Sequence, residues 1–554
     1  MSQWPILRRW PVLLAGALTT LLVLAACTSG DGGSSPPQSA RDGGDIVVHA
    51  GEPQSLDPHF SAAEIDLTIE QMIYRGLYDL LPDGTLRPAY ADGLPQISDD
   101  GLVYTIRVKS GMQWGNGEVL DARDFVFGIQ RTCNPDVAGF FQYILTNIGG
   151  CDDYYFATEA SADEKADLLN LVTVSAADNL TLELRLANPQ PTFSTLLALW
   201  PTYPAPDETL ASVDAAWPSG ADTPCNGPFC VTELVSGDHL TLGRNPNWAL
   251  GPAASLDTIT LRFIDDFSVA LRAYQSGELD LVRVGEQDLP LVRDRSDFHS
   301  QQLPSTIGLV YNLADDLLAN DSLRLALSRA IDRILYAEVV FNDGVIPTTN
   351  WIPAAEPGAN IPGIFDGVIG FDLAAAKAAL EEAGYPDGDG FPGVTLLAVD
   401  NATTRTEAEF LQNAFRENLG IDIAIDLVDG RTFGGRLFEG DFQLALSGWV
   451  HDYPDAENWL NGLFNTGAPI NFQGCSNAEI DAAIDAAQFE QDQAIRFALL
   501  QEAERLAVTT LCGYAPLYHE GNFYLINPDL LGVQPTLADH FLPQFPEMWG
   551  LAAD

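Results

Sequence analysis

The sequence predicts an α/β fold, and three features of the chain support this prediction. Apolar and polar residues alternate, as in half-exposed strands, at 102–109, 180–186 and 258–263. Near Leu303 the pattern changes, and segments with helical periodicity become frequent. Within residues 394–427 a strand, a helix and a second strand follow one another, and such βαβ units build parallel sheets with helices on both faces.

The first half of the chain is expected to be rich in sheet. The segments 102–109 and 180–186 carry apolar side chains at every second position, so each has one apolar face. The third strand, 258–263, leads to an amphipathic helix around 269–275, which ends at Gly277.

The second half is expected to alternate strands and helices. An apolar strand at 307–311 is followed by a helix. The apolar face of that helix consists of Leu323, Leu327, Ala330, Ile331 and Ile334. The βαβ unit comprises a strand at 394–399, a helix at 407–419 closed by Gly420, and a strand at 421–427.

A further strand at 442–447 indicates a binding site. Ligands of open α/β sheets bind just beyond the carboxyl ends of the strands. The residues that follow this strand, 448–454, read Gly-Trp-Val-His-Asp-Tyr-Pro. We therefore treat this segment as the candidate site.

The N-terminus predicts export. Arg8 and Arg9 precede an apolar run at 11–26 that is too short for a comfortable membrane span and is typical of a secretion signal. Its end, Leu-Ala-Ala before Cys27, resembles the lipobox of bacterial lipoproteins, which implies a signal peptide at 1–27 and a lipid on Cys27. Residues 28–44 contain almost nothing apolar and predict a flexible tether. The expected location is the outer face of the cell membrane, or the periplasm.

Six cysteines remain in an exported chain, where disulfides persist. Six cysteines allow 15 pairings. We predict the set of pairs that are local in sequence, Cys133 with Cys151, Cys225 with Cys230, and Cys475 with Cys512. No spacing among them resembles a paired zinc site.

Composition and motifs exclude several functions. The formal net charge is −50, with 77 acidic and 27 basic residues, so a nucleic-acid partner is not expected and the acid is interpreted as a solvated surface. No P-loop, GxSxG elbow or HExxH pair is present in the sequence. We therefore expect no cofactor, no metal and no enzymatic activity.

Several long motifs resemble one family. The segments at 99–117 (DDGLVYTIRVKSGMQWGNG) and 121–131 (DARDFVFGIQR) resemble family 5 extracellular solute-binding proteins, the oligopeptide and dipeptide binders of ABC importers. The resemblance recurs in order at GEPQSLDPH (51–59), CNGPF (225–229), RNPNW (244–248), YQSGELDL (274–281), ALSRAIDR (326–333) and ALSGWVHDYPDAENWL (445–460).

The resemblance implies a two-lobed clamp of the periplasmic-binding-protein type, with an extra domain inserted in lobe I. Lobe I is expected at 45–76, 190–305 and 522–554, the extra domain at 77–189 and lobe II at 306–521. Closure of the lobes around a ligand is the implied motion.

The resemblance also implies the ligand contacts. In peptide-binding members, the aspartate of the matching motif pairs with the α-ammonium of the peptide, and backbone beside the tryptophan pairs with the peptide backbone. These positions are Asp452, Trp449 and Gly448 here. Further candidates for pocket walls are Tyr453, Tyr311, Asn312, Phe60 and Ser61.

One departure concerns the carboxyl end of the ligand. Oligopeptide-type members often carry basic residues near the strand before the Gly-Trp motif, whereas Leu444 and Leu446 occupy that strand here.

The expected function is capture of short peptides by a monomeric, lipid-anchored clamp that delivers them to a permease whose ATPase subunits are separate chains. Alternatives that the sequence leaves open are the same clamp holding a nickel chelate, a sugar or an opine-like solute, and a clamp that senses ligands without transport. A lipid-anchored secreted hydrolase is the alternative from another class.

Overall fold

The computed structural model describes residues 40–81, 84–468, 470–534 and 542–553. The predicted signal peptide, the lipidated Cys27 and most of the predicted tether lie outside these residues. The last five residues of the predicted tether are described, and they bind the folded body instead of forming a free linker. Arg41 N–H donates to the Leu551 carbonyl at 2.8 Å, and Gly43 N–H donates to the Ser255 carbonyl at 2.7 Å.

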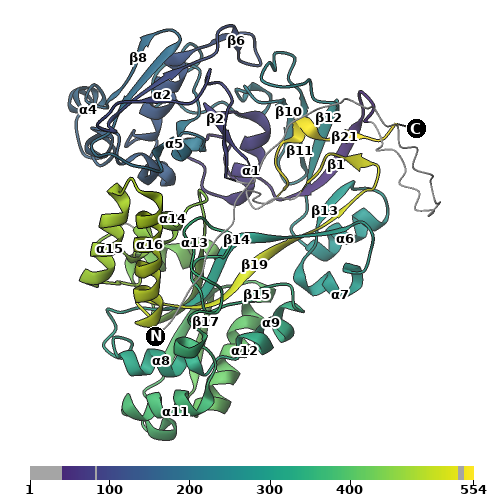
Figure 1. The fold of residues 1–554 in the computed structure, drawn as a ribbon. Coiled ribbons are helices and arrows are strands. Elements are labelled where there is room, and N and C mark those ends of the chain that lie inside the picture. Colours follow the sequence, from purple (N-terminus) through teal and green to yellow (C-terminus); the bar gives the residue numbers. More distant parts are fainter. Residues whose placement is uncertain (1–39, 82–83, 469, 535–541, 554) are drawn as a thin grey trace, which may run out of the picture. The chain divides into compact units, whose positions relative to one another are not determined.

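One 11-stranded mixed sheet organises the described chain (Figure 1). In spatial order its strands are β10 (Phe229–Val235), β11 (His239–Arg244), β12 (Thr258–Phe263), β1 (Asp45–Ala50), β13 (Leu281–Arg283), β19 (Tyr514–Ile526), β14 (Phe298–Tyr311), β18 (Leu444–Val450), β16 (Val394–Val399) and β17 (Ile423–Val428). The short strand β15 (Ile346–Pro347) pairs with β19. The two longest strands, β14 and β19, run antiparallel in the middle of the sheet.

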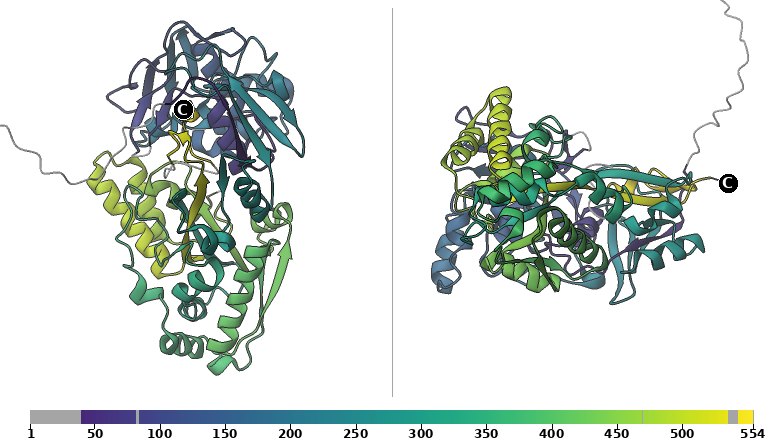
Figure 2. Two further views of the ribbon diagram at one scale, coloured as in Figure 1. Left: turned by 90° about the vertical axis from the view of Figure 1, so that its right-hand side faces the viewer. Right: turned by 90° about the horizontal axis from the view of Figure 1, so that it is seen from below.

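Two large hydrophobic cores divide the sheet. One packs against the strands from β10 to β13, and the other packs against β18, β16 and β17. The first core is built from residues between Ile46 and Leu281, from Tyr453 and from the C-terminal segment, and the second is built from residues between Leu309 and Tyr518. Figures 1 and 2 show β14 and β19 running from one half into the other. The two-lobed α/β architecture is therefore confirmed, whereas the exact limits of lobes and extra domain stay predictions.

The first core is covered by short sheets and helices. The small sheets join β4 (Gln96–Ile97), β5 (Val103–Arg107), β9 (Thr181–Arg185) and β8 (Val174–Asp178), β2 (Tyr78–Leu80) with β3 (Leu86–Pro88), β6 (Met112–Gln113) with β7 (Val119–Leu120), and β20 (Leu530–Leu531) with β21 (Gly550–Leu551). The helices include α1 (Glu64–Ile73), α2 (Ala122–Thr132), α3 (Cys151–Tyr155), α4 (Ala162–Leu169) and α5 (Phe193–Leu196), with 3₁₀ turns η1 (Phe140–Leu145), η2 (Trp200–Thr202) and η6 (Pro546–Met548). Two further helices, α6 (Phe267–Gln275) and α7 (Leu289–Val292), pack in a smaller third core with Phe523 and Leu525 of β19.

The second core is covered by longer helices. They are α8 (Asp321–Arg329), α9 (Arg333–Phe341), α10 (Asp366–Ile369), α11 (Leu373–Glu382), α12 (Ala402–Leu419), α13 (Gly430–Glu439), α14 (Ala456–Phe464), α15 (Ala478–Phe489) and α16 (Gln493–Thr509). The predicted βαβ unit is confirmed, with β16 parallel to β17 and α12 between them. Asn401 caps α12 by accepting from Thr404 N–H, and Gly420 ends it in the left-handed conformation.

One predicted helix is wrong. The helix expected to carry Leu323 to Ile334 on one face ends at Arg329, and Asp332 starts a new helix by accepting hydrogen bonds from the backbone of Ile334 and Leu335. Ile334 is 72% exposed and does not join the core. Asp332 changes the direction of the chain by capping a new helix. The spacing of apolar residues alone does not predict this break.

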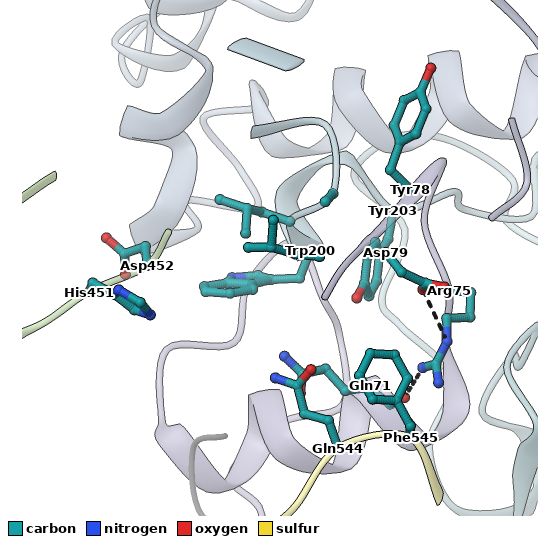
Figure 3. A pocket seen from close by; sticks show the side chains of 13 residues that line it. Gln71, Arg75, Tyr78, Asp79, Trp200, Tyr203, His451, Asp452, Gln544 and Phe545 are labelled. Carbon is teal, nitrogen blue, oxygen red and sulfur yellow. Dashed lines mark hydrogen bonds and ion pairs between the residues drawn. The ribbon is translucent and has the colours of Figure 1, made fainter. Parts of the chain in front are cut away.

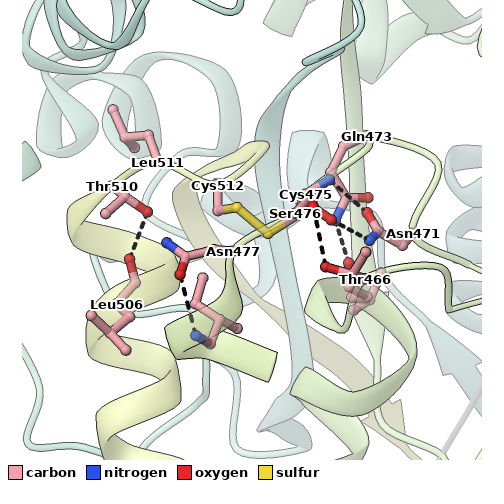
Figure 4. The surroundings of a disulfide bond; sticks show 12 residues. Thr466, Asn471, Gln473, Cys475, Ser476, Asn477, Leu506, Thr510, Leu511 and Cys512 are labelled. Carbon is pink, nitrogen blue, oxygen red and sulfur yellow. Dashed lines mark hydrogen bonds between the residues drawn. A yellow bond between two sulfur atoms is a disulfide. The ribbon is translucent and has the colours of Figure 1, made fainter. Parts of the chain in front are cut away.

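The three predicted disulfides are confirmed. Cys133 bonds Cys151, Cys225 bonds Cys230 and Cys475 bonds Cys512. The third bond joins the loop before α15 to the end of the segment between α16 and β19 (Figure 4). It therefore secures the second core next to a central strand.

Among the described residues, no helix combines the length and apolar character that crossing a membrane requires.

Candidate functional site

The Gly-Trp motif lies within a strand that has a free edge. β18 was expected to end at residue 447 but continues to Val450, where it pairs with β14. His451 N–H donates to the Pro304 carbonyl at 3.0 Å, so alternation along the antiparallel ladder directs the Gly448 backbone away from β14. On that side the described neighbour, β16, pairs with β18 only at Leu444 and Ala445.

Glycine is required at position 448 by packing. A Cβ atom there would lie 2.0 Å from the carbonyl oxygen of Thr306, which is far inside van der Waals contact. The close approach of β14 and β18 therefore depends on the missing side chain, while the outer edge of Gly448 keeps its backbone groups available to a further strand.

A buried asparagine fixes the orientation of Asp452. Asn458, in the first turn of α14, donates from Nδ2 to Asp452 Oδ2 at 3.0 Å. Its Oδ1 accepts from Asp452 N–H at 2.9 Å and from the indole Nε1 of Trp449 at 3.0 Å. One side chain thus joins both ends of the segment from Trp449 to Asp452.

A tyrosine from the other core reaches the same carboxylate. The hydroxyl of Tyr143, in η1, donates to Asp452 Oδ2. Burial raises the pKa of the Tyr143 hydroxyl, so this group stays protonated and remains a donor. The carboxylate is therefore held by Asn458 from one half of the fold and by Tyr143 from the other.

No basic side chain in the described part of the chain is paired with the Asp452 carboxyl. Burial raises its pKa, an effect that the hydrogen bonds from Tyr143 and Asn458 and the neighbouring His451 partly oppose. His451 itself lies 2.7 Å from Glu356, and within the described residues no arginine or lysine forms an ion pair with Asp452. A half-buried carboxylate that is largely desolvated in this way favours a bound cation that supplies the missing charge.

The helix that follows Asp452 is anchored by a buried ion-pair network. Arg496 of α16 binds Asp455, the N-cap of α14, at 2.7 and 2.8 Å, and Glu457 at 2.6 Å. Thr192 from the first half donates to Glu457 at 3.1 Å. Burial raises the pKa of Glu457 to about 7, against the lowering effect of Arg496. The first turn of α14, and with it Asn458, is thereby fixed in place.

Asp452 opens onto a cavity with aromatic walls (Figure 3). Its lining consists of Gln71, Arg75, Tyr78, Asp79, Leu80, Ala198, Leu199, Trp200, Tyr203, His451, Asp452, Gln544 and Phe545. In Figure 3, Asp452 and His451 lie on one side, Arg75 on the opposite side, and Trp200 between them.

The structure separates the other predicted wall residues. Tyr453 is buried beside Asp452 and packs into the first core. Tyr311 is fully buried in the second core and pairs with Leu444, six residues before Val450 along β18, and Asn312 donates to the carbonyls of Gly440 and Phe442. Tyr311 and Asn312 are therefore core residues and not walls of this cavity, because the strand carries them away from Asp452.

Phe60 and Ser61 also lie outside the cavity lining. Phe60 is 52% exposed. The hydroxyl of Ser61 is buried and donates to the Asp57 carbonyl at 2.9 Å, which is a contact within its own turn.

Several site residues were missed by sequence reasoning. Asn458 lies inside the motif at 445–460. Its position could have been predicted, since it follows Asp455, the N-cap of α14, by three residues. The other residues carry no local signal, because only the tertiary fold brings Tyr143 to Asp452 and places Trp200, Tyr203 and Phe545 around the same cavity.

Comparison with known proteins identifies relatives along nearly the whole chain. The family model described as bacterial extracellular solute-binding proteins, family 5 middle, matches residues 85–470. The oligopeptide-binding protein OppA of Bacillus subtilis (strain 168) is 26% identical over 95% of this chain and 97% of its own length. A probable deoxycholate-binding periplasmic protein of Escherichia coli (strain K12) is 28% identical over 86% of this chain and 88% of its own length.

A solved structure gives the same result for the fold. The crystal structure of a periplasmic oligopeptide-binding protein from Borrelia burgdorferi matches with a TM-score of 0.78 at 26% identity. The match covers 91% of this chain and 99% of that chain.

Proposed function

This chain belongs to the family 5 bacterial extracellular solute-binding proteins, and we propose that it captures short peptides outside the cytoplasm and delivers them to the permease of an ABC importer. One observation carries the proposal, namely the half-buried Asp452 carboxylate, which faces a cavity and has no arginine or lysine partner among the described residues. The α-ammonium of a peptide supplies that charge. The names of the relatives from Bacillus subtilis and Borrelia burgdorferi support the same ligand class.

The binding mode follows from the geometry around Asp452. The ammonium donates a hydrogen bond to the Asp452 carboxylate, and a lone pair of the Tyr143 oxygen accepts a second one beside it. The peptide backbone extends along the free edge of β18 at Gly448, as an added strand. Trp449 and Tyr453 flank this path. Recognition of backbone and ammonium accommodates many peptide sequences.

Capture requires the two halves of the fold to close on the ligand. Asp452 belongs to the half with the second core and Tyr143 to the half with the first, so a ligand bound beside their hydrogen bond contacts both halves. The long strands β14 and β19 cross from one half to the other and are the hinge in this proposal. The lobe limits at residues 305/306 and 521/522 fall inside these strands.

The proposal includes the cellular location of the protein, at the outer face of the membrane. A lipid on Cys27 would keep the binder at the membrane that holds its permease, and a tether at 28–39 would let it close and dock. The family is one of solute-binding proteins, so we expect binding without chemical change. The chain is expected to act as a monomer, and its ATPase subunits to be separate chains.

The affinity for a free-amine peptide should depend on pH through Asp452. The ammonium binds the ionised carboxylate, so affinity falls as the pH drops through the raised pKa of Asp452, at a higher pH than for an ordinary aspartate. Affinity falls again above pH of about 8, where the peptide amine loses its proton. Calorimetric titration with trialanine from pH 4 to about 9 measures both limbs.

Two controls belong to this titration. Asp452→Asn keeps the shape of the side chain and should remove the acid limb together with most of the affinity. N-acetyl-trialanine has no ammonium and should bind weakly at every pH. An unchanged acid limb in Asp452→Asn would show that another group titrates and would remove the ammonium assignment.

Asn458 should increase the affinity for the peptide indirectly, by holding the Asp452 carboxylate in place. Asn458→Ala removes the amide that holds the Asp452 carboxylate and backbone, and hydrogen bonds to charged groups contribute about 1.5–3 kcal/mol each. We expect roughly tenfold weaker binding of trialanine in calorimetric titration. Asn461→Ala, on the same helix, is the matched control and should stay within about twofold of the wild type. Equal effects of the two substitutions would contradict the positioning role.

A further inference from the structure

The cavity beside Asp452 has an aromatic wall of three residues from two separate segments. Trp200 and Tyr203 come from the η2 turn and its C-cap, and Phe545 comes from the C-terminal segment. Trp200 and Tyr203 are 3% and 6% exposed, so both rings are fixed by their surroundings. Figure 3 shows Trp200 on the side of the cavity nearer to Asp452 and Phe545 farther along it.

A glycine makes room for one of these rings. A Cβ atom at Gly76 would lie 2.9 Å from two ring carbons of Tyr203. The Tyr203 ring therefore packs directly on the backbone beside Arg75 and keeps its place in the wall.

Phe545 is held in a conformation that a large side chain rarely adopts. Its φ and ψ are 60° and 56°, in the left-handed region, which is strained for a residue other than glycine. The surroundings hold the ring, because the guanidinium groups of Arg75 and Arg87 lie 5.7 and 5.4 Å from its centroid. Strain maintained at a cavity wall points to a role in binding.

The charges at the Phe545 end of the cavity are already balanced. Arg75 donates to both oxygens of Glu547, at 2.9 and 3.1 Å, and lies 3.5 Å from Asp79. Arg87 binds the other oxygen of Asp79 at 2.7 Å. Two arginines and two carboxylates thus neutralise one another, so this group of side chains, in which Arg75 is 5% exposed, offers no net positive charge to the carboxylate of a ligand.

We propose that this cavity receives the first side chain of a bound peptide and selects aromatic and bulky aliphatic residues there over acidic ones. The inference rests on the proposed function, because the α-ammonium on Asp452 places the first side chain next to Trp200. An aromatic or aliphatic side chain loses its water shell against Trp200, Tyr203 and Phe545. An acidic side chain would be desolvated without a free cation and would face Asp452.

Four tripeptides test the selection, namely Phe-Ala-Ala, Leu-Ala-Ala, Gly-Ala-Ala and Asp-Ala-Ala, in calorimetric titrations at pH 7 on the full mature chain. Burial of a large apolar side chain is expected to make Phe-Ala-Ala and Leu-Ala-Ala about 10- to 100-fold tighter than Gly-Ala-Ala. Asp-Ala-Ala should be the weakest of the four. Equal affinities for Phe-Ala-Ala and Gly-Ala-Ala, or tightest binding of Asp-Ala-Ala, would overturn the inference.

Substitutions of the aromatic wall residues test whether this cavity is the part of the protein that selects the first side chain. In Phe545→Ala, and independently in Trp200→Leu, the affinity ratio of Phe-Ala-Ala to Gly-Ala-Ala should fall to about threefold or less. Phe438→Ala, an aromatic residue on α13 that is 56% exposed and absent from the cavity lining, should keep the wild-type ratio. A wild-type ratio in both wall variants would refute the assignment of the cavity.

The outcomes separate this inference from the proposed function. If all four peptides bind with similar affinity, peptide capture stands and the side-chain selection falls. If none of the free-amine peptides binds, both proposals fall together.

Discussion

Asp452→Ala should weaken binding of a free-amine tripeptide by about 30- to 3,000-fold. Removing one partner of an enclosed, hydrogen-bonded charge pair costs about 2–5 kcal/mol, because the other charge stays buried without compensation. Here the remaining charge is the ligand ammonium, enclosed beside Tyr143 and Asn458. His451 cannot replace the carboxylate, since its imidazole lies against Glu356 and carries no negative charge.

The acetylated ligand provides the decisive comparison for this variant. N-acetylated tripeptide lacks the ammonium, so its weaker binding should change by no more than about threefold in Asp452→Ala. Asp422→Ala removes an exposed carboxylate from the same half of the fold and should leave both affinities unchanged. Equal losses for free and acetylated peptide in Asp452→Ala would contradict the anchor, because they would reflect general damage to the site.

The largest expected effect on stability is that of Arg131→Met. Arg131 is 1% exposed, and it binds Asp57 at 2.5 Å and the carbonyls of Val213 and Ala215 at 3.1 and 2.7 Å. Its guanidinium also lies 5.3 Å from the ring centroid of Trp217. Breaking such a pair leaves the Asp57 carboxylate buried without its cation, and the expected loss is about 3–5 kcal/mol in the free energy of unfolding.

Urea unfolding followed by tryptophan fluorescence measures this loss. Arg123→Met, on the same helix α2, removes an arginine whose side chain is 45% exposed and pairs with Asp121. The Asp121 side chain is buried, but it keeps its hydrogen bond from the Arg123 backbone N–H in this variant. Because the Arg123 guanidinium is largely hydrated, the control should lose only about 0–1 kcal/mol. A second variant, Asp57→Asn in the Arg131→Met background, should recover part of the stability. Similar losses for Arg131→Met and Arg123→Met would show that the buried pair does not hold this region together.

Regular elements with clear periodicity and end signals were predictable from the sequence. The βαβ unit of β16, α12 and β17 has alternating or continuous apolar strands, and Gly420 marks the end of its helix. The three disulfides match the predicted set of pairs that are local in sequence. Local information decided each of these features.

Features decided by distant contacts were not predictable. The helix expected across Ile334 breaks because Asp332 caps a new helix, and Arg333 is then buried against the Pro516 carbonyl at 2.7 Å. Tyr311 is an aromatic residue of the kind that lines pockets, but it lies in the core because its register on β14 places it opposite Leu444.

The candidate site shows the same division. Asp452, Trp449 and Gly448 lie in one recognisable motif, and the structure brings them together through Asn458 and β18. Tyr143 approaches Asp452 across 309 residues of sequence, and Phe545 comes from the C-terminal segment. No periodicity or motif in one sequence specifies such a meeting.

Native mass spectrometry of the protein purified from its own cells tests the central claim most directly. The spectrum should show the mature chain with bound short peptides, which partial unfolding in the gas phase releases for sequencing. Peptides with free N-termini, enriched in aromatic or bulky aliphatic first residues, are the predicted result. A sugar, a metal chelate or N-blocked peptides as the retained ligand would contradict the account of Asp452 as the ammonium anchor.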